Sequence, residues 1–397
     1  MDRRLVGLVV AAIVLPLVMF VGNLKVEVPE SSLTVSEYPE QQEGRGLAEK
    51  GQTTEAIAAA SVSELKRADS AVKAPELVGI SDWINSKPLK LADLKGKVVL
   101  VDFWTYTCIN CIRTLPYLTL WQEKYSDKGL VILGIHSPEF DFEKDLENVK
   151  RAVAKYSIKY PVALDNDHDT WRAFGNNYWP HKYLIDVNGR IRYDHIGEGG
   201  YDRTERAIQG LLKERAEKMD EKPAIPESIS LPKGAVGVDF TSIATPEIYF
   251  GYTFARVNLG NEQGFMPEEV VAYAAPESYT GLSSNIPYVE GEWKNNPDGL
   301  ELVSDEGRIL LKYTAKAVNV VAGQGVVPLV MYVSLDGKPA NSTNKGGDVT
   351  IAKTGSAVAL IDEQRLYNVV NDNGYNTRVL ELAVTGKGFR IYTFTFG

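Results

Sequence analysis

The sequence predicts an α/β fold followed by an all-β sandwich, with a single transmembrane helix in front of both. Strand and helix patterns alternate between about residues 75 and 218, the helical pattern then ends, and an uncharged apolar run fills residues 5–22. Alternating strands and helices are typical of a sheet covered by helices on both faces, and a series of short β-rich runs is typical of a sandwich. A chain of 397 residues has room for two such domains and an anchor.

The composition is that of a folded protein without a nucleic-acid partner. Hydrophobic residues make up 44% of the chain and charged residues 24%, as in ordinary globular domains. The net charge is −9, and no stretch concentrates Lys and Arg into a basic stripe. Nucleic acid is therefore not expected as a partner.

The first 24 residues predict a signal anchor. Arg3 and Arg4 precede the apolar run, which as a helix spans about 27 Å and nearly crosses a hydrocarbon core. The run ends at Met19 to Gly22 without an Ala-x-Ala pattern, so we expect retention rather than cleavage. The basic pair places everything after the run outside the membrane. Residues 25–74 are polar and predict a flexible stalk.

The α/β domain is expected over residues 75–218. Residues 97–104 are β-branched and aromatic, as in a strand buried on both faces. A helix is expected to begin at the two cysteines that follow, because apolar residues then recur at helical spacing. The remaining elements expected are strands at 130–135, 160–164, 182–186 and 191–195, and helices at 142–155, 168–174 and 202–217.

A linker and a second domain complete the chain. Residues 219–235 contain Pro223, Pro226 and Pro232 and predict a linker. Residues 236–397 contain short β-rich runs separated by Gly, Asn and Asp, which predict a jelly-roll-like sandwich. The runs are 308–313, 317–321, 326–334, 378–384 and 389–396.

The chain has only two cysteines, Cys108 and Cys111. Two cysteines three positions apart cannot form a disulfide framework, so they are a catalytic dithiol, half of a metal site or a chance pair. Covalent haem attachment requires a histidine after the second cysteine, where Ile112 stands. Zinc requires about four ligands, and the four histidines, which we expect in loops or on the surface, have no ligand spacing to the pair. We therefore expect no metal and no cofactor. The histidines are His136, His168, His181 and His195.

The segment from Val101 to Pro116, VDFWTYTCINCIRTLP, resembles the active-site segment of the thioredoxin superfamily. Its core WTYTCINC is similar to the soluble region of DipZ-type thiol:disulfide proteins, in the TlpA-like branch. Asp102 stands six residues before the first cysteine, and Trp179-Pro180 precedes a predicted strand. These features together are more specific than a C-x-x-C motif alone and imply a thioredoxin fold.

The helix start and the resemblance together assign roles. Cys108 at a helix N-terminus is the expected nucleophile, because unpaired N–H groups there stabilise a thiolate, and Cys111 is expected to resolve the mixed disulfide. The resemblance implies that Asp102 accepts the proton of Cys111 and that Glu139 is an active-site glutamate. It also implies that Pro180 is a cis proline facing the dithiol. Trp104 and Trp179 are the further candidates for substrate contact.

The second domain also resembles the C-terminal domain of DipZ-type proteins, which has a carbohydrate-binding-module-like fold. Aromatic residues there could present rings to a glycan: Tyr249, Tyr252, Tyr279 and Trp293. DipZ-type proteins carry a polytopic electron-transferring membrane domain, whereas one spanning segment is predicted here. The resemblance therefore implies a separate CcdA-like membrane electron donor.

The expected function is extracytoplasmic, membrane-anchored thiol:disulfide oxidoreduction on exported proteins, with cytochrome c maturation as one setting. The Ile109-Asn110 dipeptide lacks the histidine of strong oxidants, which favours a reductase. Two alternatives remain open. One is a glycan- or protein-binding module with an auxiliary thioredoxin-like domain, and the other is a peroxiredoxin-like peroxidase.

Overall fold

The structure, a computed structural model, describes residues 65–235, 237–325 and 327–397. The predicted anchor and most of the predicted stalk lie outside the described residues. Among the helices that are described, none is long and apolar enough to cross a membrane. The anchor at residues 5–22 therefore stays a prediction.

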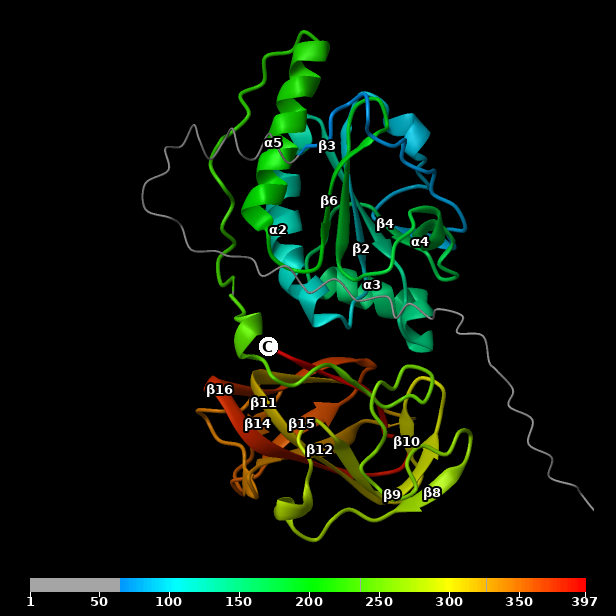
Figure 1. The fold of residues 1–397 in the computed structure, drawn as a ribbon, viewed down its shortest axis with the longest axis vertical. Helices are drawn as coiled ribbons and strands as arrows, with labels where there is room; N and C mark the ends of the chain where they lie inside the picture. Colours follow the sequence, from blue (N-terminus) through cyan, green and yellow to red (C-terminus); the bar gives the residue numbers. More distant parts are fainter. Residues whose placement is uncertain (1–64, 236, 326) are drawn as a thin grey trace, which may run out of the picture. The chain divides into compact units, whose positions relative to one another are not determined.

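The N-terminal described domain is built on a six-stranded sheet with the order β1-β4-β3-β2-β5-β6 (Figure 1). The parallel pairs are β2 with β3 and β3 with β4. The other three pairs, β1 with β4, β2 with β5 and β5 with β6, are antiparallel. All seven residues of β2 are buried, as the apolar run at 97–104 predicted. The strands are β1 (Asp82–Ile84), β2 (Val98–Trp104), β3 (Leu130–His136), β4 (Val162–Leu164), β5 (His181–Ile185) and β6 (Ile191–Ile196).

Helices cover both faces of this sheet, which confirms the predicted α/β arrangement. Alternate residues of β2 point to opposite faces: Leu100 and Trp104 pack with α2, α3 and α5, whereas Val101 and Phe103 pack with η1 and α4. The helices are η1 (Leu91–Leu94), α2 (Ile109–Tyr125), η2 (Ser126–Lys128), η3 (Asp141–Lys144), α3 (Leu146–Lys155), α4 (Asp169–Ala173) and α5 (Tyr201–Lys218).

The α/β domain begins earlier than residue 75. The backbone N–H of Lys66 donates to the carbonyl of Arg192 at 2.8 Å, and that of Ala74 donates to Gly189 at 2.9 Å. Residues 65–74, assigned by their polarity to the stalk, therefore run beside β6. The reason is that β6 is an edge strand whose backbone groups need partners.

The C-terminal domain is β-rich, as predicted, and its strands hydrogen-bond into one sheet of 11 strands. The runs 308–313 and 317–321 belong to one long strand, β11, with a register shift at Ala315 and Ala317. Most of its buried apolar residues form one large hydrophobic cluster, and Leu282, Tyr288 and Leu310 form a smaller one. The strands are β7 (Ile248–Tyr249), β8 (Val270–Tyr273), β9 (Pro287–Asn295), β10 (Leu300–Leu302), β11 (Glu306–Gly323), β12 (Leu329–Leu335), β13 (Lys338–Pro339), β14 (Thr350–Ile351), β15 (Ala357–Ile361), β16 (Arg365–Thr385) and β17 (Arg390–Phe396). A 3-10 turn, η4 (Phe240–Ser242), precedes β7, and another, η5 (Tyr279–Gly281), lies between β8 and β9.

Candidate active site

The two cysteines lie where β2 passes into α2. Cys108 caps the N-terminus of α2 with an extended backbone, and its Sγ accepts a hydrogen bond from the backbone N–H of Cys111 at 3.3 Å. The two sulfurs are free thiols. Cys108 is partly exposed, whereas Cys111 is 1% exposed. An incoming disulfide can therefore reach Cys108 and not Cys111.

The surroundings of Cys111 oppose its ionisation. Burial raises the pKa of the Cys111 thiol well above its usual range, and its interaction with Cys108 adds to the rise. A thiol in this state needs a base before it can attack a mixed disulfide. The geometry thus separates an accessible sulfur from a buried one that requires proton transfer.

Asp102 is the carboxylate that β2 places beneath this helix start. Its side chain is 1% exposed, and it lies on the same face of the sheet as Leu100 and Trp104, which pack with Cys111. Burial raises the pKa of Asp102 to about 7, and the positive charge of Lys182 opposes the rise. Asp102 is therefore poised to exchange a proton near neutral pH.

Pro180 and Trp179 stand at the start of β5. The Trp179–Pro180 peptide bond is cis, as predicted. The Trp179 ring is partly exposed; its Nε1 donates to the carbonyl of Ser137 at 3.0 Å, and its centroid lies 4.3 Å from that of Trp171. Trp104 is different, because its side chain is fully buried in the core. The expectation that Trp104 contacts substrate is wrong, since a β2 residue on the helix-covered face has no route to the surface.

Glu139 and Glu143 both follow β3, and their side chains have different partners. The Tyr249 hydroxyl lies 2.6 Å from a carboxylate oxygen of Glu139 and 2.8 Å from one of Glu247, and it donates its single proton to one of them at a time. Burial and the Glu247 charge raise the pKa of Glu139. Glu139 is thus engaged by the β domain, and no contact with the cysteines is seen among the described residues.

Glu143, which the sequence reasoning missed, supports the segment before Cys108. It is fully buried, and its Oε1 accepts a hydrogen bond from the Thr107 hydroxyl at 2.5 Å. Its Oε2 accepts from the backbone N–H groups of Glu139 and Phe140 at 2.6 and 3.0 Å. Glu143 therefore ties the cysteine loop to the segment after β3. Its place four residues after Glu139 was the available signal.

The β domain contacts residues on both sides of Cys108. The Tyr106 hydroxyl donates to the carbonyl of Gln364 at 3.2 Å. Ile109 and Ile112 pack against a hydrophobic cluster to which Tyr249 and Tyr392 belong. The β domain therefore helps to shape the surroundings of the dithiol.

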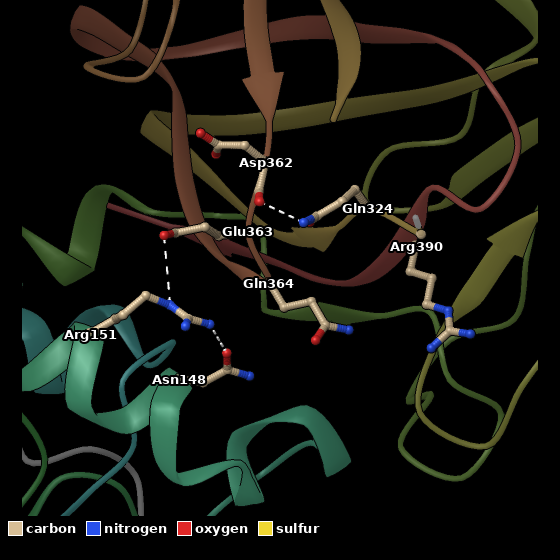
Figure 2. A pocket seen from close by; sticks show the side chains of 8 residues that line it. Asn148, Arg151, Gln324, Asp362, Glu363, Gln364 and Arg390 are labelled. Atoms are coloured by element: carbon tan, nitrogen blue, oxygen red, sulfur yellow. Dashed lines mark hydrogen bonds and ion pairs between the residues drawn. The ribbon is translucent and has the colours of Figure 1, made fainter. Parts of the chain in front are cut away.

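A polar cavity of about 580 Å³ lies beside α3 (Figure 2). Figure 2 shows Arg151 of α3 directed toward Glu363 of the β domain, and their ion pair measures 3.8 Å. The cavity is lined by Asn148, Arg151, Gln324, Gly325, Asp362, Glu363, Gln364 and Arg390.

Two of the four histidines differ from the expectation of loop or surface positions, whereas His168 stands in the turn before α4. His136 is fully buried on β3 and His181 is 5% exposed on β5. Burial lowers the pKa of His136 to about 3, so this imidazole is neutral. Within residues 65–235, 237–325 and 327–397, no group of three or more His, Cys, Asp or Glu side chains could hold a metal.

Comparison with known proteins agrees with this site. Residues 72–212 match the family model described as Redoxin, and residues 245–397 match one described as Thioredoxin like C-terminal domain. The chain is similar to protein DipZ of Mycobacterium tuberculosis, with 36% identity over 83% of this chain and 43% of DipZ. It therefore spans less than half the length of that relative.

A second similarity covers most of a smaller relative. The thiol-disulfide oxidoreductase ResA of Bacillus thuringiensis is 33% identical over 36% of this chain and 75% of ResA. The thiol-disulfide oxidoreductase YkuV of Bacillus subtilis is 29% identical over 94% of its length. With the thioredoxin-like sheet and the dithiol at the start of α2, these matches show that the chain belongs to the thioredoxin-like thiol-disulfide oxidoreductases, in the TlpA/ResA-like group with DipZ as a relative.

Proposed function

We propose that the chain reduces disulfides of exported proteins through Cys108 and Cys111. The observation that carries the proposal is the contrast between the two sulfurs. Cys108 is partly exposed at the N-cap of α2, and Cys111 is buried behind it beside an equally buried carboxylate. This contrast supports attack by Cys108 and resolution by Cys111.

The reaction proceeds in two exchanges. The Cys108 thiolate attacks one sulfur of the substrate disulfide, which forms an enzyme–substrate disulfide and releases the other substrate sulfur as a thiolate. Cys111 gives its proton to Asp102 and attacks the Cys108 sulfur. The second substrate sulfur then leaves as a thiolate, the substrate has gained two electrons, and the two enzyme cysteines have become a disulfide. A separate donor returns the enzyme to the dithiol.

We place this activity outside the cytoplasm, on a single-pass anchor. The apolar run at residues 5–22 behind Arg3 and Arg4 supports the anchor. Because the two cysteines must be reduced again after each turnover, the proposal includes a membrane electron donor of the CcdA kind. Apocytochrome c is one substrate that would fit such a setting.

Insulin reduction with dithiothreitol as the electron source tests the proposal. The wild-type chain should accelerate reduction, and Cys108→Ser should abolish the acceleration. Replacement of the exposed Asp127 by Asn is the matched control and should leave the rate unchanged. Wild-type reduction by the Cys108 variant would refute the proposal. Peroxide consumption by the wild-type chain without insulin reduction would favour the peroxidase alternative.

The second candidate is ligand recognition by the β domain. Trp293 and Tyr249 are buried at 0% and 6% exposure, so neither can stack on a sugar as the sequence suggested. The polar cavity of Figure 2 is the feature that favours this candidate, because amide and charged groups line it. Loss of binding to a cell-wall glycan in Arg390→Ala, with insulin reduction intact, would support it.

A further inference from the structure

Lys182 is a fully buried lysine in the α/β domain. Lysine is almost never fully buried unless its charge is paired. Its Nζ donates to the carbonyl of Gly197 at 3.2 Å, and in the part of the chain that the structure describes it forms no ion pair. Burying a charged group without an ion pair costs free energy, so we examine the groups that lie around the Lys182 ammonium.

The strand pairing places Lys182 under the dithiol. Lys182 lies directly opposite Asp102 in the antiparallel ladder of β2 and β5, and opposite residues share a face of the sheet. Leu184, two residues along β5, packs in the same cluster as Cys111. Lys182 therefore shares with Asp102 the face that α2 covers.

Several charged or titratable groups face Lys182. Burial lowers the pKa of Lys182, whereas Asp102, Cys111, Glu198 and Cys108 act in that order to raise it. Glu198 is already ion-paired with Arg113 at 2.8 Å.

Two histidines complete the set of groups around Lys182. His195 on β6 has its pKa lowered to about 4 by burial and by Lys182, so it is neutral near pH 7. Burial also lowers the pKa of His181 on β5, and the two ring nitrogens of His181 contact Asn176 and Asp194. Neither imidazole supplies a charge, and Asp102 remains as the carboxylate without an ion pair of its own.

We propose that Lys182 is a positioning residue that favours the ionised form of Asp102 and stabilises the Cys111 thiolate during resolution of the mixed disulfide. This inference rests on the proposed function of the two cysteines. In the step concerned, the Cys111 proton moves to Asp102, the Cys111–Cys108 bond forms, and the bond between Cys108 and the substrate sulfur breaks. Lys182 exchanges no atoms; its positive charge acts on Asp102 and Cys111.

Lys182→Met removes the charge and keeps a similar length. Asp102 then holds a proton at higher pH and accepts the Cys111 proton less readily. We expect the pH profile of resolution to move up by about one unit, as for one tenfold change in a protonation equilibrium, and resolution at pH 7 to slow about fivefold. The rate of Cys108 alkylation should change less. Lys182→Gln, which keeps a polar end for the Gly197 carbonyl, should give the same shift if the charge is what matters.

The test is rapid mixing of the full-length dithiol chain, in detergent, with oxidised insulin at pH 6 to 9, with acid quench and mass analysis of the mixed disulfide. Lys124→Met is the matched control, because Lys124 pairs with Glu205 at 2.8 Å near the far end of α2. A wild-type pH profile in both Lys182 variants would overturn the inference while leaving the proposed function intact. Absence of a mixed disulfide in the wild-type chain and in both Lys182 variants, together with no reduction of insulin, would overturn both.

Discussion

Replacing Asp102 by Asn should change how the stability of the protein depends on pH. Asp102 is 1% exposed, and burial raises its pKa from the ordinary 3.8 to about 7. Asparagine has nearly the same shape and carries no charge at any pH. The substitution therefore removes the cost of ionising a buried carboxyl and leaves the packing in place.

The sign follows from proton binding. Between pH 3.8 and about pH 7, the unfolded chain has lost the Asp102 proton while the folded chain keeps it. The folded state binds more protons in this window, so its stability falls as the pH rises. At 1.36 kcal/mol per pH unit, the contribution amounts to about 4 kcal/mol by pH 8. Relative to wild type, Asp102→Asn should gain that amount between pH 4 and pH 8.

Urea unfolding of the reduced chain, followed by tryptophan fluorescence, measures this difference. All tryptophans except Trp293 lie in the α/β domain, so the signal reports on the right part of the chain. Asp127→Asn, at a carboxylate that is 72% exposed, controls for the change in net charge and should show no such gain. A constant difference between Asp102→Asn and wild type from pH 4 to pH 8 would refute the reasoning.

Three further predictions concern the support of the site. A chain beginning at residue 75 loses the pairing along β6 and the Lys66–Asp194 ion pair of 2.9 Å. Its free energy of unfolding in urea should be lower by about 1–3 kcal/mol than that of a chain beginning at residue 62. Equal stability would show that residues 65–74 only lie beside the sheet. Glu143→Gln places an amide donor among groups that already donate, including the Thr107 hydroxyl, and should lower the thermal unfolding temperature and the insulin reduction rate together; a normal rate would separate Glu143 from the site. Tyr249→Phe removes the hydroxyl shared by two carboxylates and should cost about 1–3 kcal/mol in urea unfolding while insulin reduction persists; loss of reduction would assign the shared hydroxyl to catalysis.

The parts of the fold that were predicted correctly are those with strong local patterns. The run 97–104 has the β-branched and aromatic residues of a buried strand, and the cysteines mark the start of α2 because a helical apolar pattern begins there. The β-rich pattern after residue 236 gave the class of the second domain. It could not reveal that two short runs join into β11, since a register shift depends on the partner strand.

The errors concern residues whose environment depends on distant contacts. Trp104 has an aromatic ring suited to substrate contact, and only the packing of α2 over β2 shows that the ring is buried. Lys182 was not identified at all, because a lysine in a strand is usually exposed. Residues 65–74 are as polar as a stalk, but they hydrogen-bond to the free edge of β6, which the sequence alone does not reveal.

Trapping the mixed disulfide tests the central claim about the two cysteines most directly. Full-length Cys111→Ser and Cys108→Ser chains are each incubated with oxidised insulin at pH 7, alkylated, and analysed by non-reducing electrophoresis and peptide mass mapping. Because Cys108 is the accessible sulfur and Cys111 is 1% exposed, Cys111→Ser should accumulate a disulfide between Cys108 and insulin, and Cys108→Ser should accumulate none. A stable adduct through Cys111 in the Cys108→Ser chain, with none in the Cys111→Ser chain, would contradict the assignment of the nucleophile.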